Sequence, residues 1–405
     1  NHIVNMRMEI KVSGIINPVK LFVVITIFLP IYLIGLVFPR SRHIWVFGGF
    51  GGRLYSDNAK ELFKWVYQHQ KDEIKPYWIT KDKGVLKYLR NSNFPCAYAY
   101  SFSGLYLTLR ANTYIYTHTS SDINFWTGGG AHKINLWHGS AIKKIHRDVE
   151  APASTEAQVF SARGLGYLRY RLLKPGYFET PDLIFAASDC VAKNLKSSHN
   201  VKESQICISG YPRNDRLFNR DGFPQGDNIE IDKRMVLYLP TFRERSDSNV
   251  ALLKLISSAS RLPELLFIVK QHPASHLDHE TNLPDNVSIV NSEFDTYELM
   301  KRSCALITDY SSVALDYLLL DRPILYFCYD YDDYIANERG FYFDFDDVTG
   351  GKVVMDVDEL LDELVLQVIE GHDEYRDVRH RVMEKFNAKI SRTYCEDAYT
   401  KIRER

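Results

Sequence analysis

The pattern of hydrophobic and polar positions along the chain alternates between two periods. Short apolar runs bounded by polar or turn-forming residues predict buried strands. Longer stretches with apolar residues three and four positions apart follow most of these runs and predict helices. Strands that alternate with helices in this way are typical of parallel sheets covered by helices. The predicted strands lie at residues 43–48, 76–80, 113–118, 133–137, 183–187, 206–209, 235–239, 266–270, 287–290, 305–307 and 324–327.

At 405 residues the chain is long enough for two α/β domains of ordinary size. We expect an N-terminal segment over residues 1–40, one domain over 41–181, a second over 182–372 and a polar helical segment over 373–405. The last segment is expected to cross back to the first domain. Ligands of such sheets bind beyond the carboxyl ends of the strands, so residues that directly follow a predicted strand become candidate site residues.

An uncharged apolar run of 18 residues lies near the N-terminus, at 21–38. As a helix it would extend roughly 27 Å, close to the roughly 30 Å hydrocarbon core of a bilayer. Basic residues flank both ends, and no small-residue cleavage pattern of a signal peptide follows. We therefore expect a membrane anchor rather than a buried core helix. Because Pro30 lies in the middle of the run, a helix that spans the bilayer and one that lies in its interface both stay open.

Charge and cysteine content exclude several classes of protein. The formal net charge is −1, with 50 basic and 51 acidic residues, so nothing indicates a nucleic-acid partner. The six cysteines lack the paired spacing of a zinc site or a disulfide framework, which is typical of free thiols in a reducing compartment. No acidic cluster of metal-binding type stands out. We expect no cofactor and no obligatory metal ion.

The segment over residues 163–177, RGLGYLRYRLLKPGY, interleaves basic residues with leucines and tyrosines at near-helical spacing. Basic and aromatic side chains in this pattern can lie on an anionic membrane surface. A helix that packs at a domain interface explains the same pattern equally well.

Two histidines lie within two residues of the ends of predicted strands, one in each half of the chain. His138 follows the strand at 133–137 and precedes Gly139, and His272 follows the strand at 266–270 and precedes a proline. The ordinary pKa of histidine lies near 6.5, which suits a general base. A lone histidine is more often structural, but two at equivalent places favour a shared function. We expect both to face one cleft between the two domains.

Residues with hydroxyl and guanidinium groups follow two other strands. Ser311 and Ser312 lie between a strand and the start of a helix, where backbone N–H groups and the helix dipole favour a phosphate. Ordinary N-capping by either serine is the alternative. Thr241 and Arg243 follow the strand at 235–239 and together suit a diphosphate. The segment GYPRND at 210–215 predicts a tight turn held by an Arg–Asp contact.

Six motifs occur in one order along the chain, and together they resemble the CDP-glycerol glycerophosphotransferase family, the primases and polymerases of teichoic acids and related capsule polymers. The resemblance covers roughly residues 55–346. The motifs are WHGSAIKK at 137–144, GYPRND at 210–215, PTFR at 240–243, KQHP at 270–273, ITDYSSVALDY at 307–317 followed by DRP, and NERGFYFDF at 337–345.

The resemblance implies a GT-B-like fold, in which two doubly wound Rossmann-type domains face a cleft. It implies a CDP-alcohol donor held by the C-terminal domain and a lipid-linked acceptor held by the N-terminal domain, on the cytoplasmic side of the cell membrane. The family's active-site histidines fall on His138 and His272. The substrate-binding positions that the motifs assign are Gly139, Ser140, Thr241, Arg243, Lys270, Asp309, Ser311, Ser312, Asp316 and Arg339.

The implied reaction moves an alcohol phosphate from a CDP-alcohol to an acceptor hydroxyl group and releases CMP. His138 is expected to take the hydroxyl proton, and His272 to support the phosphate oxygens or the leaving CMP. Three alternatives stay open: transfer of ribitol phosphate from CDP-ribitol, transfer of a sugar from a nucleotide sugar on the same fold, and a non-catalytic, membrane-tethered binding partner of a polymer assembly.

The chain departs from the family pattern at two places. Ser140 and Ala141 stand where the family often has a threonine and a proline, which we expect to affect the fit of the acceptor. The segment 349–351, TGG, stands where a proline–glycine segment is common, so we expect the local donor loop to differ from the family pattern. Neither departure removes a proposed catalytic group.

Overall fold

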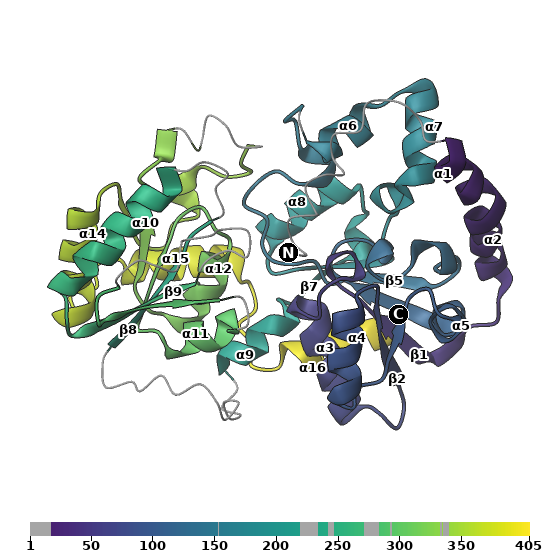
Figure 1. Ribbon diagram of the computed structural model, residues 1–405, viewed down its shortest axis with the longest axis horizontal. Helices are drawn as coiled ribbons and strands as arrows, with labels where there is room; N and C mark the ends of the chain where they lie inside the picture. Colours follow the sequence, from purple (N-terminus) through teal and green to yellow (C-terminus); the bar gives the residue numbers. More distant parts are fainter. Residues whose placement is uncertain are drawn as a thin grey trace. The chain divides into compact units, whose positions relative to one another are not determined.

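The chain divides into two compact units, each built on its own sheet (Figure 1). The computed structural model describes residues 18–152, 154–218, 234–241, 247–270, 283–291, 294–332, 334 and 340–405. The first unit comprises the described residues up to Gly139, together with Lys144–Asp215 and Thr393–Arg405. The second comprises Ser140–Lys143 and the described residues of Arg216–Arg392. Two parallel α/β domains are thus confirmed.

The sheet of the first unit has seven strands among the described residues, all parallel, in the order β3-β2-β1-β4-β5-β6-β7. The strands are β1 (Ser41–Phe47), β2 (Lys75–Thr80), β3 (Cys96–Tyr98), β4 (Ala111–Tyr116), β5 (His132–Asn135), β6 (Leu183–Ala186) and β7 (Ile206–Ile208). The helices are α3 (Asp57–His69), α4 (Lys83–Asn91), α5 (Phe102–Arg110), α6 (Thr155–Ser161), α7 (Gly164–Leu173), α8 (Asp189–His199) and α16 (Tyr394–Arg403).

Both faces of this sheet are buried, which explains why its strands consist of nearly continuous apolar runs. Successive side chains of a strand point to opposite faces. Trp45 and Phe47 of β1 therefore belong to one core cluster, with Phe63 of α3, whereas Val46 belongs to another, with Tyr114 of β4.

The observed units do not divide at the predicted boundary between residues 181 and 182. β6 and β7, which we expected in the second domain, pair with β5 in the first sheet, and the first unit continues to Asp215. The alternation of strands and helices runs through this region without a break, so the sequence carries no sign of which sheet a strand joins. The predicted C-terminal segment is also divided, because α15 (Arg376–Phe386) belongs to the second unit and α16 to the first.

The sheet of the second unit has six parallel strands among the described residues, in the order β10-β9-β8-β11-β12-β13. These are β8 (Arg234–Leu239), β9 (Leu265–Lys270), β10 (Val287–Val290), β11 (Ala305–Thr308), β12 (Ile324–Phe327) and β13 (Lys352–Val354). The helices discussed below are α10 (Asp247–Ser258), α11 (Thr296–Arg302), α12 (Val313–Tyr317) and α14 (Val357–Leu364). Leucine and valine side chains of α10 and α14 cover one face of this sheet.

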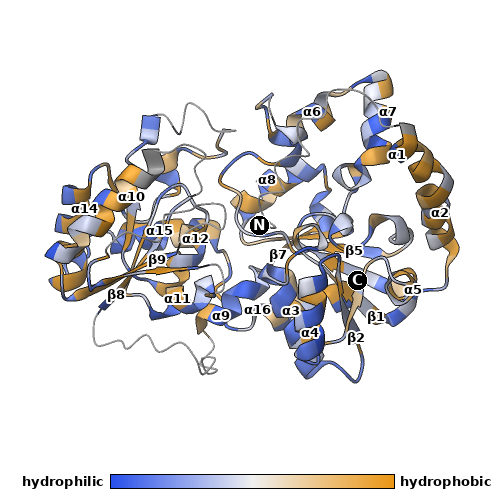
Figure 2. Cartoon of the chain, viewed as in Figure 1, coloured by the Kyte–Doolittle hydropathy of each residue, from blue (hydrophilic) through white to orange (hydrophobic). Residues whose placement is uncertain are grey.

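The apolar N-terminal run forms one helix, Val19–Val37, that is long and apolar enough to cross a membrane. It consists of α1 (Pro18–Val23), a π-helical turn at Val24–Phe28 and α2 (Leu29–Val37). One side of the helix lies against the first unit: Phe28 stacks on Trp126 and Tyr32 on Phe125, with ring centroids 5.6 and 5.2 Å apart. Figure 2 shows the helix as a nearly continuous apolar segment at the edge of that unit.

The segment Thr349–Gly350–Gly351, where the chain departs from the family pattern, forms the turn that leads into β13. Tyr326 Oη accepts a hydrogen bond from the backbone N–H of Gly350 at 3.1 Å. A Cβ atom on Gly351 would lie 1.8 Å from the carbonyl oxygen of Ile324 on the neighbouring strand. The second glycine therefore permits the close approach of β13 to β12.

We expect Gly351→Ala to lower the free energy of unfolding by about 2 kcal/mol or more, because the added methyl group meets rigid backbone. Gly166→Ala is the matched control, since its new Cβ would lie 3.8 Å from its nearest neighbour, within α7. Urea denaturation of both variants measures the difference. Equal stability of the two variants would contradict the close approach of these strands.

Candidate active site

His138 lies just beyond the carboxyl end of β5, in a turn with unusual backbone angles. Trp137 has φ 54° and Gly139 has φ 125°, so the backbone turns sharply at the residue before the histidine and again at the residue after it. The Nδ1 atom of His138 lies 3.2 Å from the carbonyl oxygen of Thr117. Because a carbonyl oxygen only accepts hydrogen bonds, Nδ1 carries the proton and Nε2 carries the lone pair. The residue as a whole is partly exposed.

The surroundings of His138 favour its neutral form. Desolvation by the surrounding protein lowers the pKa of His138 from 6.5 to about 3, and the imidazole of His118 adds to the shift. Asp57 and the Thr117 carbonyl act in the opposite direction but do not offset the desolvation. The ring is therefore uncharged at neutral pH and can accept a proton at Nε2.

Arg213 holds the His138 turn in place. Its Nη1 donates to the carboxylate of Asp57 at 2.9 Å and to the carbonyl oxygen of His138 at 2.8 Å. Asn58 completes the connection, because its Oδ1 accepts from the Arg213 N–H and its Nδ2 donates to the Trp137 carbonyl. A side chain on Gly139 would collide with the guanidinium, since its Cβ would lie 2.6 Å from Nη2.

The GYPRND segment thus differs from its predicted form. Arg213 pairs with Asp57 of α3 rather than with the nearby Asp215. Asp215 instead accepts the backbone N–H groups of Tyr394 and Cys395, at 2.6 and 2.8 Å, and so caps α16. An arginine two residues before an aspartate suggests a local contact, and no local pattern indicates a partner 156 residues away.

A second histidine, which the sequence analysis missed, lies against the first. His118 follows β4 as His138 follows β5, and the two rings stack with centroids 4.1 Å apart at 13°. The edge of Phe50, from the glycine-rich loop after β1, contacts His118 with centroids 4.8 Å apart. A signal was present, because His118 ends a predicted strand beside the strand that leads to His138.

In the second unit, Ser311 and Ser312 lie between β11 and α12, as predicted, and both are partly exposed. The hydroxyl oxygen of Ser311 accepts from the Val313 N–H at 3.4 Å, whereas the Ser312 side chain makes no capping hydrogen bond. N-capping therefore does not account for Ser312.

The two predicted aspartates of this turn are buried and support it from within. Asp309 accepts hydrogen bonds from the backbone N–H of Thr241 at 3.0 Å and from the Thr241 hydroxyl group. Asp316 accepts from the hydroxyl group of Tyr297 at 2.7 Å. Both carboxylates are at most 3% exposed. Asp309 thereby ties the start of the PTFR segment to the serine turn.

Two further predicted binding residues, Lys270 and Ser140, are held by protein contacts or buried. The ammonium group of Lys270 donates to Thr296 Oγ1 at 2.8 Å and to the Phe294 carbonyl, and desolvation lowers its pKa. Ser140 is buried, at 5% exposure, and belongs to the second unit, whereas Gly139 belongs to the first. His272, Arg243 and Arg339 lie outside the described residues, so their roles stay predictions.

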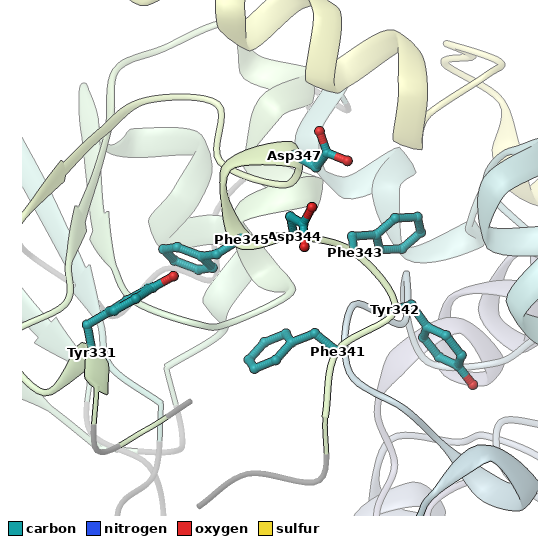
Figure 3. Close-up of a pocket in the computed structure, with 7 residues that line it drawn as sticks. All are labelled: Tyr331, Phe341, Tyr342, Phe343, Asp344, Phe345 and Asp347. Carbon is teal, nitrogen blue, oxygen red and sulfur yellow. The ribbon is translucent and has the colours of Figure 1, made fainter. Parts of the chain in front are cut away.

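The second unit contains a pocket of about 460 Å³ lined by aromatic and acidic side chains (Figure 3). The rings of Tyr331, Phe341 and Phe345 face it, and the exposed carboxylate of Asp344 lies at its edge, while Tyr342 points away. Tyr310, next to Ser311, joins this aromatic group, with ring centroids 5.4 Å from Phe345 and 6.4 Å from Tyr331. Such a pocket suits a planar ring with hydrogen-bond donors.

Three histidines of the first unit that are desolvated by the surrounding protein predict a loss of stability in acid. Desolvation lowers the pKa of His138 to about 3 and of His146 to about 4, and holds the pKa of His199 well below 6.5. Their folded-state pKa values are depressed, so their contribution is complete above about pH 6.5. It is lost as the pH falls, because the unfolded chain takes up protons first.

We expect the free energy of unfolding, measured by urea denaturation, to fall between pH 7 and pH 5, with about 2 kcal/mol of the loss due to His146 alone. In the variant His146→Phe, the free energy of unfolding should fall by about 2 kcal/mol less between pH 7 and pH 5 than in the natural protein. Identical pH dependence in the variant and the natural protein would show that His146 is not held neutral by burial.

Comparisons with known proteins agree with the motifs. The family model described as CDP-Glycerol:Poly(glycerophosphate) glycerophosphotransferase matches residues 31–392. A teichoic acid glycerol-phosphate transferase of Staphylococcus aureus is 25% identical over 365 residues, covering 85% of this chain and 89% of that protein. A teichoic acid poly(glycerol phosphate) polymerase of Bacillus spizizenii is 27% identical over 353 residues, covering 82% and 85%.

The fold is similar to that of the wall teichoic acid polymerase TagF, with a TM-score of 0.72 at 20% identity, covering 96% of each chain. At this identity the likeness concerns the fold alone. It confirms the predicted GT-B-like fold class of two parallel-sheet domains.

Proposed function

Because the chain belongs to the CDP-glycerol:poly(glycerophosphate) glycerophosphotransferase family, we propose that it moves glycerol phosphate from CDP-glycerol to an acceptor hydroxyl group and releases CMP. Its relatives carry out glycerol-phosphate transfer in teichoic acid synthesis. The proposed acceptor is a lipid-linked saccharide or a growing polymer. The observation that carries the proposal is the hydrogen bond of the His138 Nδ1–H to the Thr117 carbonyl, which leaves the lone pair on Nε2 of a partly exposed ring in the family's WHGS motif.

In the proposed reaction, the acceptor oxygen attacks the β-phosphorus of the donor while its proton passes to Nε2 of His138. The bond between the β-phosphorus and the oxygen that bridges to the α-phosphorus breaks, and CMP leaves with that oxygen. Positioning and charge stabilisation supply most of the rate in such transfers. His272 and Arg243, matched to the family by position, would support the phosphate oxygens.

The second unit is the proposed site of the donor. The pocket beside Tyr310 suits the cytosine ring, which can stack on Tyr331 and Phe341. The carboxylate of Asp344 would then accept from the exocyclic amino group of the base, a pairing that cytosine allows. The partly exposed hydroxyl groups of Ser311 and Ser312 lie next in the chain to Tyr310, where the diphosphate would follow.

Ribitol phosphate is the second candidate for the transferred group. A teichoic acid ribitol-phosphate primase of Bacillus spizizenii is 28% identical over 245 residues, covering 57% of this chain. Ribitol differs from glycerol only in the length of the polyol, so the same catalytic groups could serve both donors. Transfer of a sugar from a nucleotide sugar would also require a base for the acceptor hydroxyl group, so His138 alone does not separate it from phosphate transfer. Binding without catalysis would leave His138 without a hydroxyl group to deprotonate.

A donor and acceptor panel tests the proposal. CMP release from CDP-glycerol, CDP-ribitol and a nucleotide sugar is measured with and without a lipid-linked disaccharide, and the product is identified by mass spectrometry. We expect CMP release that depends on the acceptor, fastest with CDP-glycerol. His138→Ala should lower turnover by about 10²-fold or more, because it removes the general base.

His132→Ala is the matched control, since His132 is exposed at the start of the same strand. It should retain the natural turnover. Wild-type turnover in His138→Ala would remove that histidine from the mechanism, and absence of CMP release from every CDP-alcohol would favour the binding-partner alternative.

We propose that the N-terminal helix lies in the membrane interface rather than across the bilayer, with the catalytic units on the cytoplasmic side. Its docked side contacts polar backbone: Arg40 donates to the carbonyl oxygens of Gly35 and Thr127 at 3.3 and 2.8 Å. A spanning helix would also carry the backbone groups of Phe125 and Trp126, whose rings stack on Tyr32 and Phe28 in the middle of the helix, to membrane depth, where polar backbone exposed to lipid is costly. An in-plane helix keeps them at the surface.

The outer side of this helix supplies an apolar surface. Its exposed residues are Val19, Phe22, Ile25, Ile27, Leu33, Ile34, Leu36 and Val37. α7 lies beside α1 and has no buried residue, and it exposes Leu165, Tyr167 and Leu168 among arginines (Figure 1). Apolar and basic groups together suit an anionic lipid surface.

We expect the protein to bind vesicles that contain phosphatidylglycerol and to be released by alkaline carbonate, which does not extract spanning helices. The double variant Ile27→Asn and Leu36→Asn should bind at least about tenfold more weakly, because two apolar side chains leave the interface. Ile390→Asn is the control, with a similar exposure of 55% against 52% and 51%. Retention after carbonate treatment would indicate a spanning helix instead.

A further inference from the structure

We propose that His118 and Asp122 are positioning residues that fix the orientation and the tautomer of His138. This inference rests on the proposed function of His138 as the general base. It assigns a role to two side chains that lie outside the family motifs, at the carboxyl end of the neighbouring strand β4.

Asp122 is the buried anchor of this arrangement. Its carboxylate is 2% exposed and accepts three backbone N–H groups, from Gly51 at 2.8 Å, Thr117 at 3.1 Å and His118 at 3.0 Å. Burial alone would raise the pKa of Asp122, but the hydrogen bonds from His118 and these backbone groups outweigh it, so the pKa lies below its ordinary value. The anchor is therefore an anion at neutral pH.

The anchor acts on His138 through a single peptide group. The N–H of His118 and the carbonyl of Thr117 belong to the same planar peptide unit, in which they point in opposite directions. Asp122 receives the N–H on one side, and the carbonyl receives Nδ1–H of His138 on the other. The carboxylate thus orients the carbonyl that sets which nitrogen of His138 carries the proton.

The ring of His118 supports the same histidine from its face. The two imidazoles stack at 4.1 Å and 13°, so the His138 ring cannot rotate out of plane without meeting its neighbour. The His118 ring is itself held, because its Nδ1 lies 3.1 Å from the hydroxyl oxygen of Thr117 and 3.8 Å from the Asp122 carboxylate. Asn135 joins the two strand ends by donating to the His118 carbonyl at 3.0 Å.

This support has a consequence for the chemistry. A general base must present its lone pair at a fixed place, and displacement of a catalytic group by about 1 Å can cost about 10²-fold in rate. If the Thr117 carbonyl turns away, Nδ1–H of His138 loses its partner and the other tautomer, with the proton on Nε2, becomes populated. That tautomer cannot accept a proton from the acceptor hydroxyl group at Nε2.

Three variants of the full chain separate positioning from other roles. His118→Phe keeps a ring against His138 but has no titratable group, whereas His118→Ala removes the ring. Asp122→Asn keeps the volume but loses the charge that holds the peptide group. Nitrogen-15 chemical shifts of the His138 ring report its tautomer without substrate, and steady-state kinetics separate kcat from KM.

We expect the natural protein and His118→Phe to show His138 with the proton on Nδ1. Asp122→Asn and His118→Ala should show a mixture of tautomers, with kcat lowered about 10- to 100-fold and KM for the donor changed less than about threefold. His69→Ala is the control, because it removes an imidazole stacked on Trp65, at 5.0 Å, elsewhere in the same unit. It should leave the His138 shifts unchanged.

If His138 carries its proton on Nδ1 in both Asp122→Asn and His118→Ala, the inference is wrong. Equal losses of kcat in His118→Phe and His118→Ala would also overturn it, since the ring would then act through its charge or by direct contact. The tautomer is read without substrate, so its response stands apart from catalysis. If the tautomer changes but the natural protein releases no CMP, the proposed function fails and the positioning remains.

Discussion

The ion pair between Arg213 and Asp57 is the interaction on which the candidate active site depends. It joins α3, the turn after β7 and the turn after β5, and both side chains are about nine-tenths buried. Removing one partner of such a pair leaves an uncompensated buried charge, which typically costs about 3–5 kcal/mol. Because the same guanidinium holds the His138 carbonyl and closes over Gly139, this pair sets the place at which the histidine leaves the sheet.

Other parts of the first unit set the position and the charge of His138. The parallel sheet delivers His118 and His138 to adjacent strand ends, and the density of the surrounding protein keeps the His138 ring neutral. A neutral ring with a fixed Nδ1–H is a proton acceptor and not an electrostatic clamp for phosphate. The groups suited to a nucleotide, an aromatic pocket beside two serine hydroxyl groups, belong to the second unit. Under the proposed function, the first unit would activate the acceptor hydroxyl group and the second unit would hold the donor.

The periodicity of the sequence predicted the parallel α/β architecture because strands buried on both faces have unmistakable apolar runs, as in β8 and β11. The position of His138 after β5 and of the serines after β11 followed from the same pattern. What the pattern could not predict were contacts between distant segments. Arg213 contacts Asp57, and Asp309 contacts Thr241, because each sheet brings distant strand ends together. Local spacing instead suggested that Arg213 pairs with Asp215. We assigned β6 and β7 to the wrong sheet for a related reason. The alternation of strands and helices along the chain does not indicate the order of the strands in a sheet. The contact between Tyr32 and Phe125 could not be predicted, because in a helix that is apolar on all sides the sequence does not indicate which side is buried.

The most direct test of the central claim follows the β-phosphorus of the donor. CDP-glycerol labelled with phosphorus-32 at that atom is incubated with the protein and a lipid-linked acceptor, and the products are separated into nucleotide and lipid fractions. If His138 activates a hydroxyl group for attack at the β-phosphorus, the label appears in the lipid fraction and the released nucleotide is unlabelled CMP. Label retained in a released nucleoside diphosphate would mean that the bond broken lies on the other side of the phosphorus, and the chain would not be a phosphotransferase.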